Sequence, residues 1–130
     1  MKSREILKRH FDGEDGTFLI IARCELRWDW QAFRELTSAM CSVAADEKGG
    51  QQIERWVAHG FWFCDTWIRE WTGHPDFPRP EQQAYEDAIE LIHDLAYYLF
   101  LGESPYEDDA LQRKSKGQEI ASVDILGGES

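Results

Sequence analysis

The fold is decided by residues 51–102, which read QQIERWVAHGFWFCDTWIREWTGHPDFPRPEQQAYEDAIELIHDLAYYLFLG. On both sides of a proline-rich segment, apolar residues recur at three- and four-residue steps, which places them on one face of an α-helix. Prolines at positions 75, 78 and 80 fix their own φ angles and disfavour helix in the residues before them, so this segment is a stiff extended link. We therefore predict two long antiparallel helices, 51–72 and 80–101, at the centre of the fold.

The two predicted helices are bounded by glycine and proline. Gly73 is placed to end the first helix, Pro80 suits the first turn of the second, and Gly102 ends it. Within the first helix, Gly60 and Cys64 lie four residues apart on the apolar stripe and are small enough to let a neighbouring helix approach closely. The residues of the second helix that are predicted to point inward are Tyr85, Ala88, Ile89, Ile92, Leu95, Ala96, Leu99 and Phe100.

The N-terminal half predicts two further helices and contains one ambiguous segment. Ser3 can cap a first, short helix, and Asp29 can cap a longer second one. Residues 18–26 alternate as a short strand would, yet Leu19 and Ile21 make the other face apolar as well. A buried helix explains the pattern equally well, and we favour it because a lone strand would need a partner.

These patterns together predict a mainly α protein, a single compact bundle of about four to five helices. The composition agrees, because 42% of the 130 residues are apolar and six are tryptophans, which is ample material for a core. We assign residues 1–112 to the helical domain. Residues 113–130 form a polar C-terminal tail that we expect to be partly docked or disordered.

The balance of charge excludes some classes of function. The formal net charge is −11, from 25 acidic and 14 basic side chains. Nucleic-acid binding draws its affinity from basic side chains that displace counterions at phosphates, so we predict no nucleic-acid partner. The same balance disfavours docking on an anionic membrane, and no apolar run of the sequence is long enough to span a bilayer.

The cysteines indicate a reducing compartment. Cys24, Cys41 and Cys64 are odd in number, are widely spaced and lie among apolar residues. We interpret them as reduced thiols in the core of a cytoplasmic protein. The N-terminus leads into an amphipathic stretch rather than the apolar region of a signal peptide.

The sequence contains no motif for catalysis or for a cofactor. Glu90 and His93 form the E-x-x-H unit of di-iron helical bundles, but the unit occurs once and Glu90 points to the solvent side. His10, His59 and His93 do not converge on a helical wheel, which disfavours a three-histidine zinc site. Cys64 lies in the buried stripe. We therefore predict no catalytic residue, no metal and no cofactor.

The residues that we single out for binding lie on the two long helices. Between Arg79 and Arg113, 33 consecutive residues contain nine acids and no lysine or arginine. The residues at 86, 90 and 94 are acidic and share one helix face, and a tyrosine at 97 continues the row. A tryptophan at 62 lies off the apolar stripe, where another element covers it or it is available as an interface anchor. The predicted partner-binding residues are Glu86, Glu90, Asp94, Tyr97 and Trp62.

Three functions are compatible with these features. We favour a small acidic protein-binding module that inhibits or neutralises a basic partner, in the manner of an immunity protein, an antitoxin or a nucleic-acid mimic. The first alternative is a ligand-binding or enzymatic domain that uses the His74 loop and a pocket lined by Trp56, Trp67 and Trp71. The second alternative is a structural subunit that forms a homodimer through a helix face.

Overall fold

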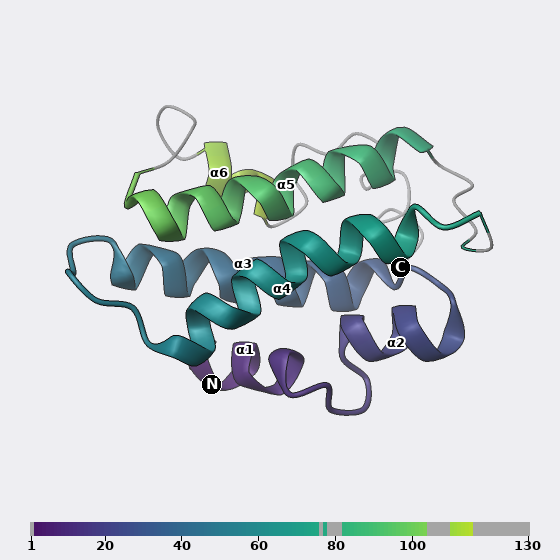
Figure 1. Ribbon diagram of the computed structural model, residues 1–130, viewed down its shortest axis with the longest axis horizontal. Helices are drawn as coiled ribbons and strands as arrows, with labels where there is room; N and C mark the ends of the chain where they lie inside the picture. The colour runs from purple at the N-terminus through teal and green to yellow at the C-terminus, as the bar shows by residue number, and fades with distance from the viewer. Residues whose placement is uncertain (1, 76, 78–81, 104–109, 116–130) are drawn as a thin grey trace.

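The computed structural model describes residues 2–75, 77, 82–103 and 110–115 of the chain (Figure 1). These residues form six helices: α1 (Ser3–Phe11), α2 (Phe18–Glu25), α3 (Trp30–Glu47), α4 (Arg55–Thr72), α5 (Gln82–Leu101) and α6 (Ala110–Ser115). Within the described ranges there is no strand, so the predicted mainly helical bundle is confirmed. The alternative of a short strand at 18–26 is wrong, because most of that segment is α2.

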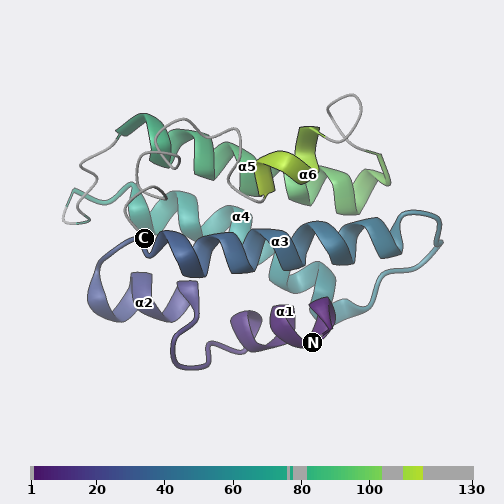
Figure 2. The same cartoon turned by 180° about the vertical axis from the view of Figure 1, so that it is seen from behind.

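The helices gather around α3. It packs against α1 and α2 on one side and against α5 and α6 on the other, as both opposite views show (Figures 1 and 2). Helix α4 packs along α5 and runs in the opposite direction (Figure 1). The predicted antiparallel pair is therefore present, and α3 joins it at the centre of the bundle.

The start of α4 differs from the prediction. The sequence pattern suggests a helix from residue 51, but α4 begins at Arg55. Glu54 takes the N-cap position in a non-helical conformation, and its carboxylate accepts hydrogen bonds from Arg4 Nη1 at 2.9 Å and from Trp56 Nε1 at 3.2 Å. The predicted start of α5 at Pro80 lies outside the described residues.

The helix ends test the predicted caps. Asp29 is confirmed as the N-cap of α3, since its carboxylate accepts a hydrogen bond from the Ala32 amide at 2.9 Å. Ser3 is the first residue of α1 and not its cap, because Lys2 occupies the cap position without a side-chain hydrogen bond. Gly102 follows α5 with a φ of 76°, a left-handed conformation that glycine adopts without a steric penalty.

Aromatic rings from several elements meet in the core. Trp28 lies just before α3 and is buried among rings of α2, α3, α5 and the link that follows α4. The distances between its ring centroid and the neighbouring centroids are 5.0 Å to Phe18, 5.0 Å to Tyr85, 5.2 Å to Phe33 and 6.4 Å to Phe77. Because burial of each aromatic side chain stabilises the fold by a few kcal/mol, this cluster ties the separate elements to α3.

Gly60 is the point where α4 comes close to another helix, as predicted. A β-carbon at this position would overlap the ring of Phe11, the last residue of α1. The ring of Phe11 also packs edge-on against Trp56 and Phe61, with centroid distances of 6.2 and 6.0 Å. The small residue therefore lets α1 sit directly against α4, and Cys64 is fully buried one turn further along.

The cysteines do not all lie in the core. Cys41 and Cys64 are buried free thiols, and burial raises the pKa of Cys64, which removes its nucleophilic character at neutral pH. Cys24 is exposed, so the prediction of a core thiol is wrong for this residue. Helix α2 buries Phe18 and Ala22, and Cys24 falls on the opposite side of the helix.

A buried histidine joins the first three helices. The imidazole of His10 is fully buried, and its Nδ1 accepts a hydrogen bond from the Phe18 amide at 3.4 Å, which satisfies one of the free amides at the start of α2. The proton is therefore on Nε2, which lies 2.8 Å from Oε1 of Glu35 on α3. Burial lowers the pKa of His10, although Glu35 acts against this shift.

Helix α6 brings the beginning of the predicted tail into the bundle. It packs against α3 and α5 and buries Leu111 completely. The hydroxyl of Thr37 in α3 donates a hydrogen bond to the carbonyl oxygen of Ser115, the last residue of α6. The boundary predicted after residue 112 thus falls inside a packed helix, and residues 116–130 lie outside the described residues.

Replacement of Gly60 by alanine tests the contact between α1 and α4. Alanine normally favours a helix over glycine by about 1 kcal/mol, but here its methyl group forces the Phe11 ring away. We expect G60A to lower the free energy of unfolding by about 1–3 kcal/mol in urea titrations. The control is G49A, whose methyl group meets no atom within 4 Å. Equal stability of G60A and wild type would contradict the close approach.

Buried His10 predicts a pH dependence of stability. Its folded pKa is lowered from the ordinary 6.5, so the unfolded chain binds a proton more readily. The contribution of His10 to the free energy of unfolding is therefore complete above about pH 6.5. Below that pH it decreases, by at most about 1.4 kcal/mol per pH unit. Urea titrations between pH 5 and 7.5 measure this slope, which H10Q should reduce. H59Q, at an exposed histidine, should leave it unchanged.

Candidate functional site

The outer surfaces of α4 and α5 form one continuous face. Its register is marked by Asp65 of α4, whose carboxylate lies 3.1 Å from Nδ1 of His93 on α5. Because the helices are antiparallel, one turn back from Asp65 and one turn forward from His93 lead in the same direction. Trp62 and Tyr97 therefore lie on the same side of this contact. We call the surface the α4/α5 face and define it as Trp62, Asp65, Arg69, Glu86, Glu90, His93, Tyr97, Phe100 and Leu101.

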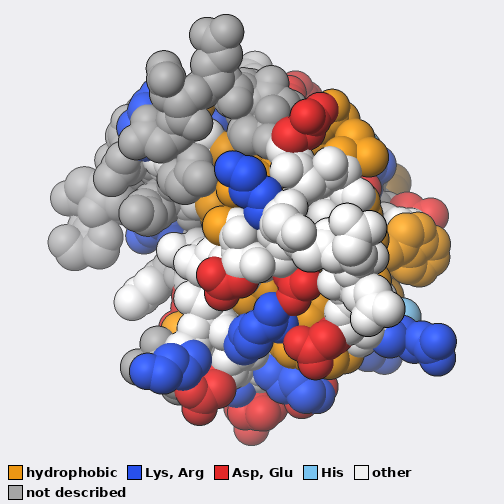
Figure 3. All heavy atoms as spheres, turned by 90° about the vertical axis from the view of Figure 1, so that its left-hand side faces the viewer, with side chains coloured by type: hydrophobic (Ala, Val, Ile, Leu, Met, Phe, Trp, Pro, Cys, Tyr) orange, Lys and Arg blue, Asp and Glu red, His pale blue; other side chains and the backbone are white. Residues whose placement is uncertain are grey.

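One half of the α4/α5 face is apolar. Its four large side chains are well exposed to solvent, with exposed fractions of 59% for Trp62, 37% for Tyr97, 46% for Phe100 and 59% for Leu101. The space-filling view shows hydrophobic side chains reaching the surface near carboxylates (Figure 3). Phe100 was predicted to point inward, and this prediction is wrong. The buried face of α5 ends at Leu99, and Phe100 is rotated onto the row that contains Tyr97.

The other half of the α4/α5 face is acidic. Glu86 and Glu90 are exposed and line a shallow depression together with Arg69, Gln82, Ile89 and His93. In the described part of the chain, no lysine or arginine forms an ion pair with either glutamate. Glu86 accepts a hydrogen bond from the side-chain Nε2 of Gln82 at 2.8 Å, and Arg69 is paired with Asp65 at 3.3 Å. Three carboxylates thus face a single guanidinium, and the local charge is negative.

Asp94 does not share the exposure of the other two acids. It is half-buried and takes part in an interaction within the protein, whereas His93 is exposed. The exposed row of α5 therefore runs through positions 86, 90, 93, 97 and 100. The predicted row contained Asp94, and the observed row contains His93 in its place. The row shifts because two helical turns span about 7 residues rather than 8.

The residues considered for metal binding do not come together. Among the described residues, no group of three histidine, cysteine or carboxylate side chains could hold a metal ion. His93 faces Asp65 instead of forming a site with Glu90, and His10 is bound to Glu35. Neither contact supplies the set of ligands that zinc or a di-iron centre requires.

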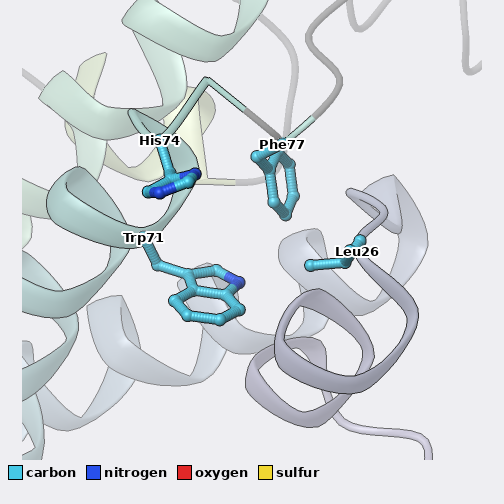
Figure 4. A pocket seen from close by; sticks show the side chains of 4 residues that line it. All are labelled: Leu26, Trp71, His74 and Phe77. Carbon is cyan, nitrogen blue, oxygen red and sulfur yellow. The ribbon is translucent and has the colours of Figure 1, made fainter.

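A second feature lies where α4 ends. A hollow of about 180 Å³ is lined by Leu26, Trp71, His74 and Phe77. The close view shows the four side chains arranged around a common space, with Leu26 approaching from the end of α2 (Figure 4). Trp71 is fixed there because its Nε1 donates a hydrogen bond to the Ala22 carbonyl at 2.9 Å.

The three tryptophans of the alternative pocket, Trp56, Trp67 and Trp71, do not line one common pocket. Of the three, only Trp71 lines the hollow that contains His74 among the described residues. Trp67 lines a different hollow, between α1, α2 and α4, with His10 and Phe63 among its neighbours. The ring of Trp56 packs against Phe11 and lies under the ammonium group of Lys8, 5.6 Å from its centroid.

Some residues of the α4/α5 face were not predicted, because the face is formed by two helices. The spacing within one helix does not show which residues of the other lie next to it. The spacing of three and four residues along α5 could have added His93 and Phe100 to the row of acidic residues. Asp65 and Arg69 become neighbours of that row only through the register between α4 and α5, which no local pattern specifies. Trp62 was singled out by its position off the stripe, and its exposure is a result of the packing.

Comparison of the chain with protein-family models, with curated proteins and with solved structures finds no match. Among the described residues, none of the helices has the length and apolar content that crossing a membrane requires. The functional interpretation therefore rests on the geometry of the α4/α5 face and of the hollow at the end of α4.

The two tryptophans at 62 and 28 should respond differently to truncation. We expect W62A to change the free energy of unfolding by less than about 0.5 kcal/mol, because its side chain is mainly exposed. W28A removes the centre of the aromatic core and should lower it by about 3–5 kcal/mol. Urea titrations followed by circular dichroism measure both. A large loss of stability in W62A would show that another part of the chain covers this side chain.

Proposed function

We propose that this chain is a binding module for a basic protein, which it contacts through the α4/α5 face. The observation that carries the proposal is the exposure of Trp62 and Tyr97 on the same face as the carboxylates of Glu86 and Glu90. Exposed apolar side chains that gather on one face of a protein often mark an interaction site. Tryptophan and tyrosine are also among the residues that contribute most to binding at protein interfaces.

The charges of the face suggest the chemistry of the partner. Glu86 and Glu90 lack an ion pair within the described residues, so lysine or arginine from outside can pair with them. Attraction between a chain of net charge −11 and a basic surface accelerates association, and the apolar contacts then slow dissociation. The partner that fits this face is therefore a protein with a basic rim around an apolar recess.

Binding of this kind would cover the basic surface of the partner. We infer that the module neutralises its partner, as an immunity protein, an antitoxin or a nucleic-acid mimic does, since a basic surface often serves to bind nucleic acid. The proposed location is the cytoplasm, because Cys24, Cys41 and Cys64 are free thiols and a reducing compartment keeps them so.

Charge reversal on the face tests the proposal. The wild-type chain is used to capture its partner from source cells, and association with the purified partner is then measured at 50 and 300 mM salt. We expect E86K/E90K to slow association by about tenfold at low salt and to weaken its salt dependence, because steering by these charges is lost. W62A should mainly accelerate dissociation, by about tenfold or more.

The matched control reverses the same amount of charge elsewhere. Glu5 in α1 and Asp15 before α2 are exposed. Helices α1 and α2 lie on the side of the bundle away from α5 (Figure 1). E5K/D15K should slow association much less than E86K/E90K does. Equal effects of the two double variants would mean that only net charge matters. A concentration-dependent mass that W62A abolishes would instead identify the face as a homodimer interface.

A further inference from the structure

The hollow at the end of α4 has the size of a small-molecule site. Leu26 lies at the end of α2, Trp71 in the last turn of α4, and His74 and Phe77 in the link that follows. Figure 4 shows that these separate segments surround one space, whose volume is about 180 Å³. Apolar cavities of about 150 Å³ hold a benzene-sized molecule, whereas sites for drug-sized ligands exceed about 300 Å³. The volume therefore suits a ligand of one or two rings.

The chemistry of the lining favours an uncharged aromatic ligand. The lining residues that the structure describes carry no carboxylate, ammonium or guanidinium group, and three of the four are rings. The indole N–H of Trp71 is already bonded to the Ala22 carbonyl, so Trp71 offers mainly ring carbon to the hollow. Aromatic rings prefer other rings in offset or edge-to-face contact, which stabilises them beyond simple burial.

Trp71 is also the last member of a row of rings along α4. His59, Phe63, Trp67 and Trp71 lie four residues apart and are nearly parallel, with centroid distances of 6.3, 6.0 and 5.6 Å between successive rings. The hollow begins where this row ends. A planar molecule in the hollow would add one more ring beside Trp71, with Phe77 on another side.

Leu26 supplies an independent observation. It has a φ of 52°, the left-handed conformation that is unfavourable for leucine, and its side chain is 42% exposed. Glycine or asparagine at this position would favour the fold more, because both adopt left-handed backbone readily. A leucine in this strained position costs backbone energy, and its side chain provides an apolar wall of the hollow.

We propose that the hollow formed by Leu26, Trp71, His74 and Phe77 is a binding site for a small, uncharged, planar aromatic molecule of one or two rings. Leu26 and Phe77 enclose the ring, Trp71 supplies the aromatic contact, and His74 gives the lining its polar side. The site is separate from the α4/α5 face.

Indole is a suitable probe, and amide nuclear magnetic resonance spectra of the full chain follow its binding. We expect saturable shifts of the signals of Leu26, Trp71, His74 and Phe77, with a dissociation constant on the order of 1 mM or below. L26N retains a residue that suits the left-handed backbone but removes the apolar wall, so it should fold normally and bind indole about fivefold more weakly. L101N, at an exposed leucine of α5, is the matched control and should bind indole as the wild type does.

Further outcomes decide the ligand class and the location. Cyclohexanol, which is not planar, should bind at least about fivefold more weakly than indole, and equal binding would overturn the aromatic specificity. Shifts that do not saturate, or that centre on Trp62 and Phe100, would overturn the site itself. E86K/E90K should bind indole like the wild type, so failure of the α4/α5 proposal and failure of this one are distinguishable.

Discussion

The antiparallel register of α4 against α5 is the constraint on which both surface features depend. Asp65 opposite His93 marks this register, which places Trp62 and Tyr97 on the same side of the contact and Arg69 near Glu86 and Glu90 of α5. The same arrangement requires the chain to reverse direction after Thr72. The reversal carries Phe77 into the aromatic core, where it contacts Trp28, and leaves the hollow beside Trp71.

Trp62 is exposed because the other sides of α4 are already occupied by packing contacts. One side of the helix packs against α5, and the side with Gly60 receives the Phe11 ring of α1. The buried residues Val57, Phe61, Cys64 and Ile68 fill the space between these contacts. An additional large apolar residue has no inward position left on such a helix, so Trp62 remains in solvent.

The α4/α5 face and the hollow differ in what they can recognise. The face is wide and combines carboxylates with exposed rings, which suits a protein surface that is basic around an apolar contact. The hollow is small and is lined largely by rings, which suits one small molecule. They lie on different parts of α4, because Trp62 is near its middle and Trp71 is in its last turn. Binding at one therefore does not require the other.

Local patterns by themselves determined the helices. Three- and four-residue spacing of apolar residues, Asp29 as a cap and glycine at 102 correctly placed most of α3, α4 and α5, because these signals act within a few residues of the chain. The sequence also determined the net charge and the absence of basic residues between positions 79 and 113. The start of α4 was predicted four residues too early, and Glu54, its N-cap, is paired with Arg4, which is distant in sequence.

Only the tertiary structure decided which of these side chains meet. The contact between Asp65 and His93, the exposure of Trp62 and Phe100, and the hollow beside Trp71 all depend on how helices pack. Packing depends on the shapes of many side chains that are far apart in the sequence, so no short pattern contains it. The helices are therefore a local property of this chain, and the surfaces proposed for binding are a property of the whole bundle.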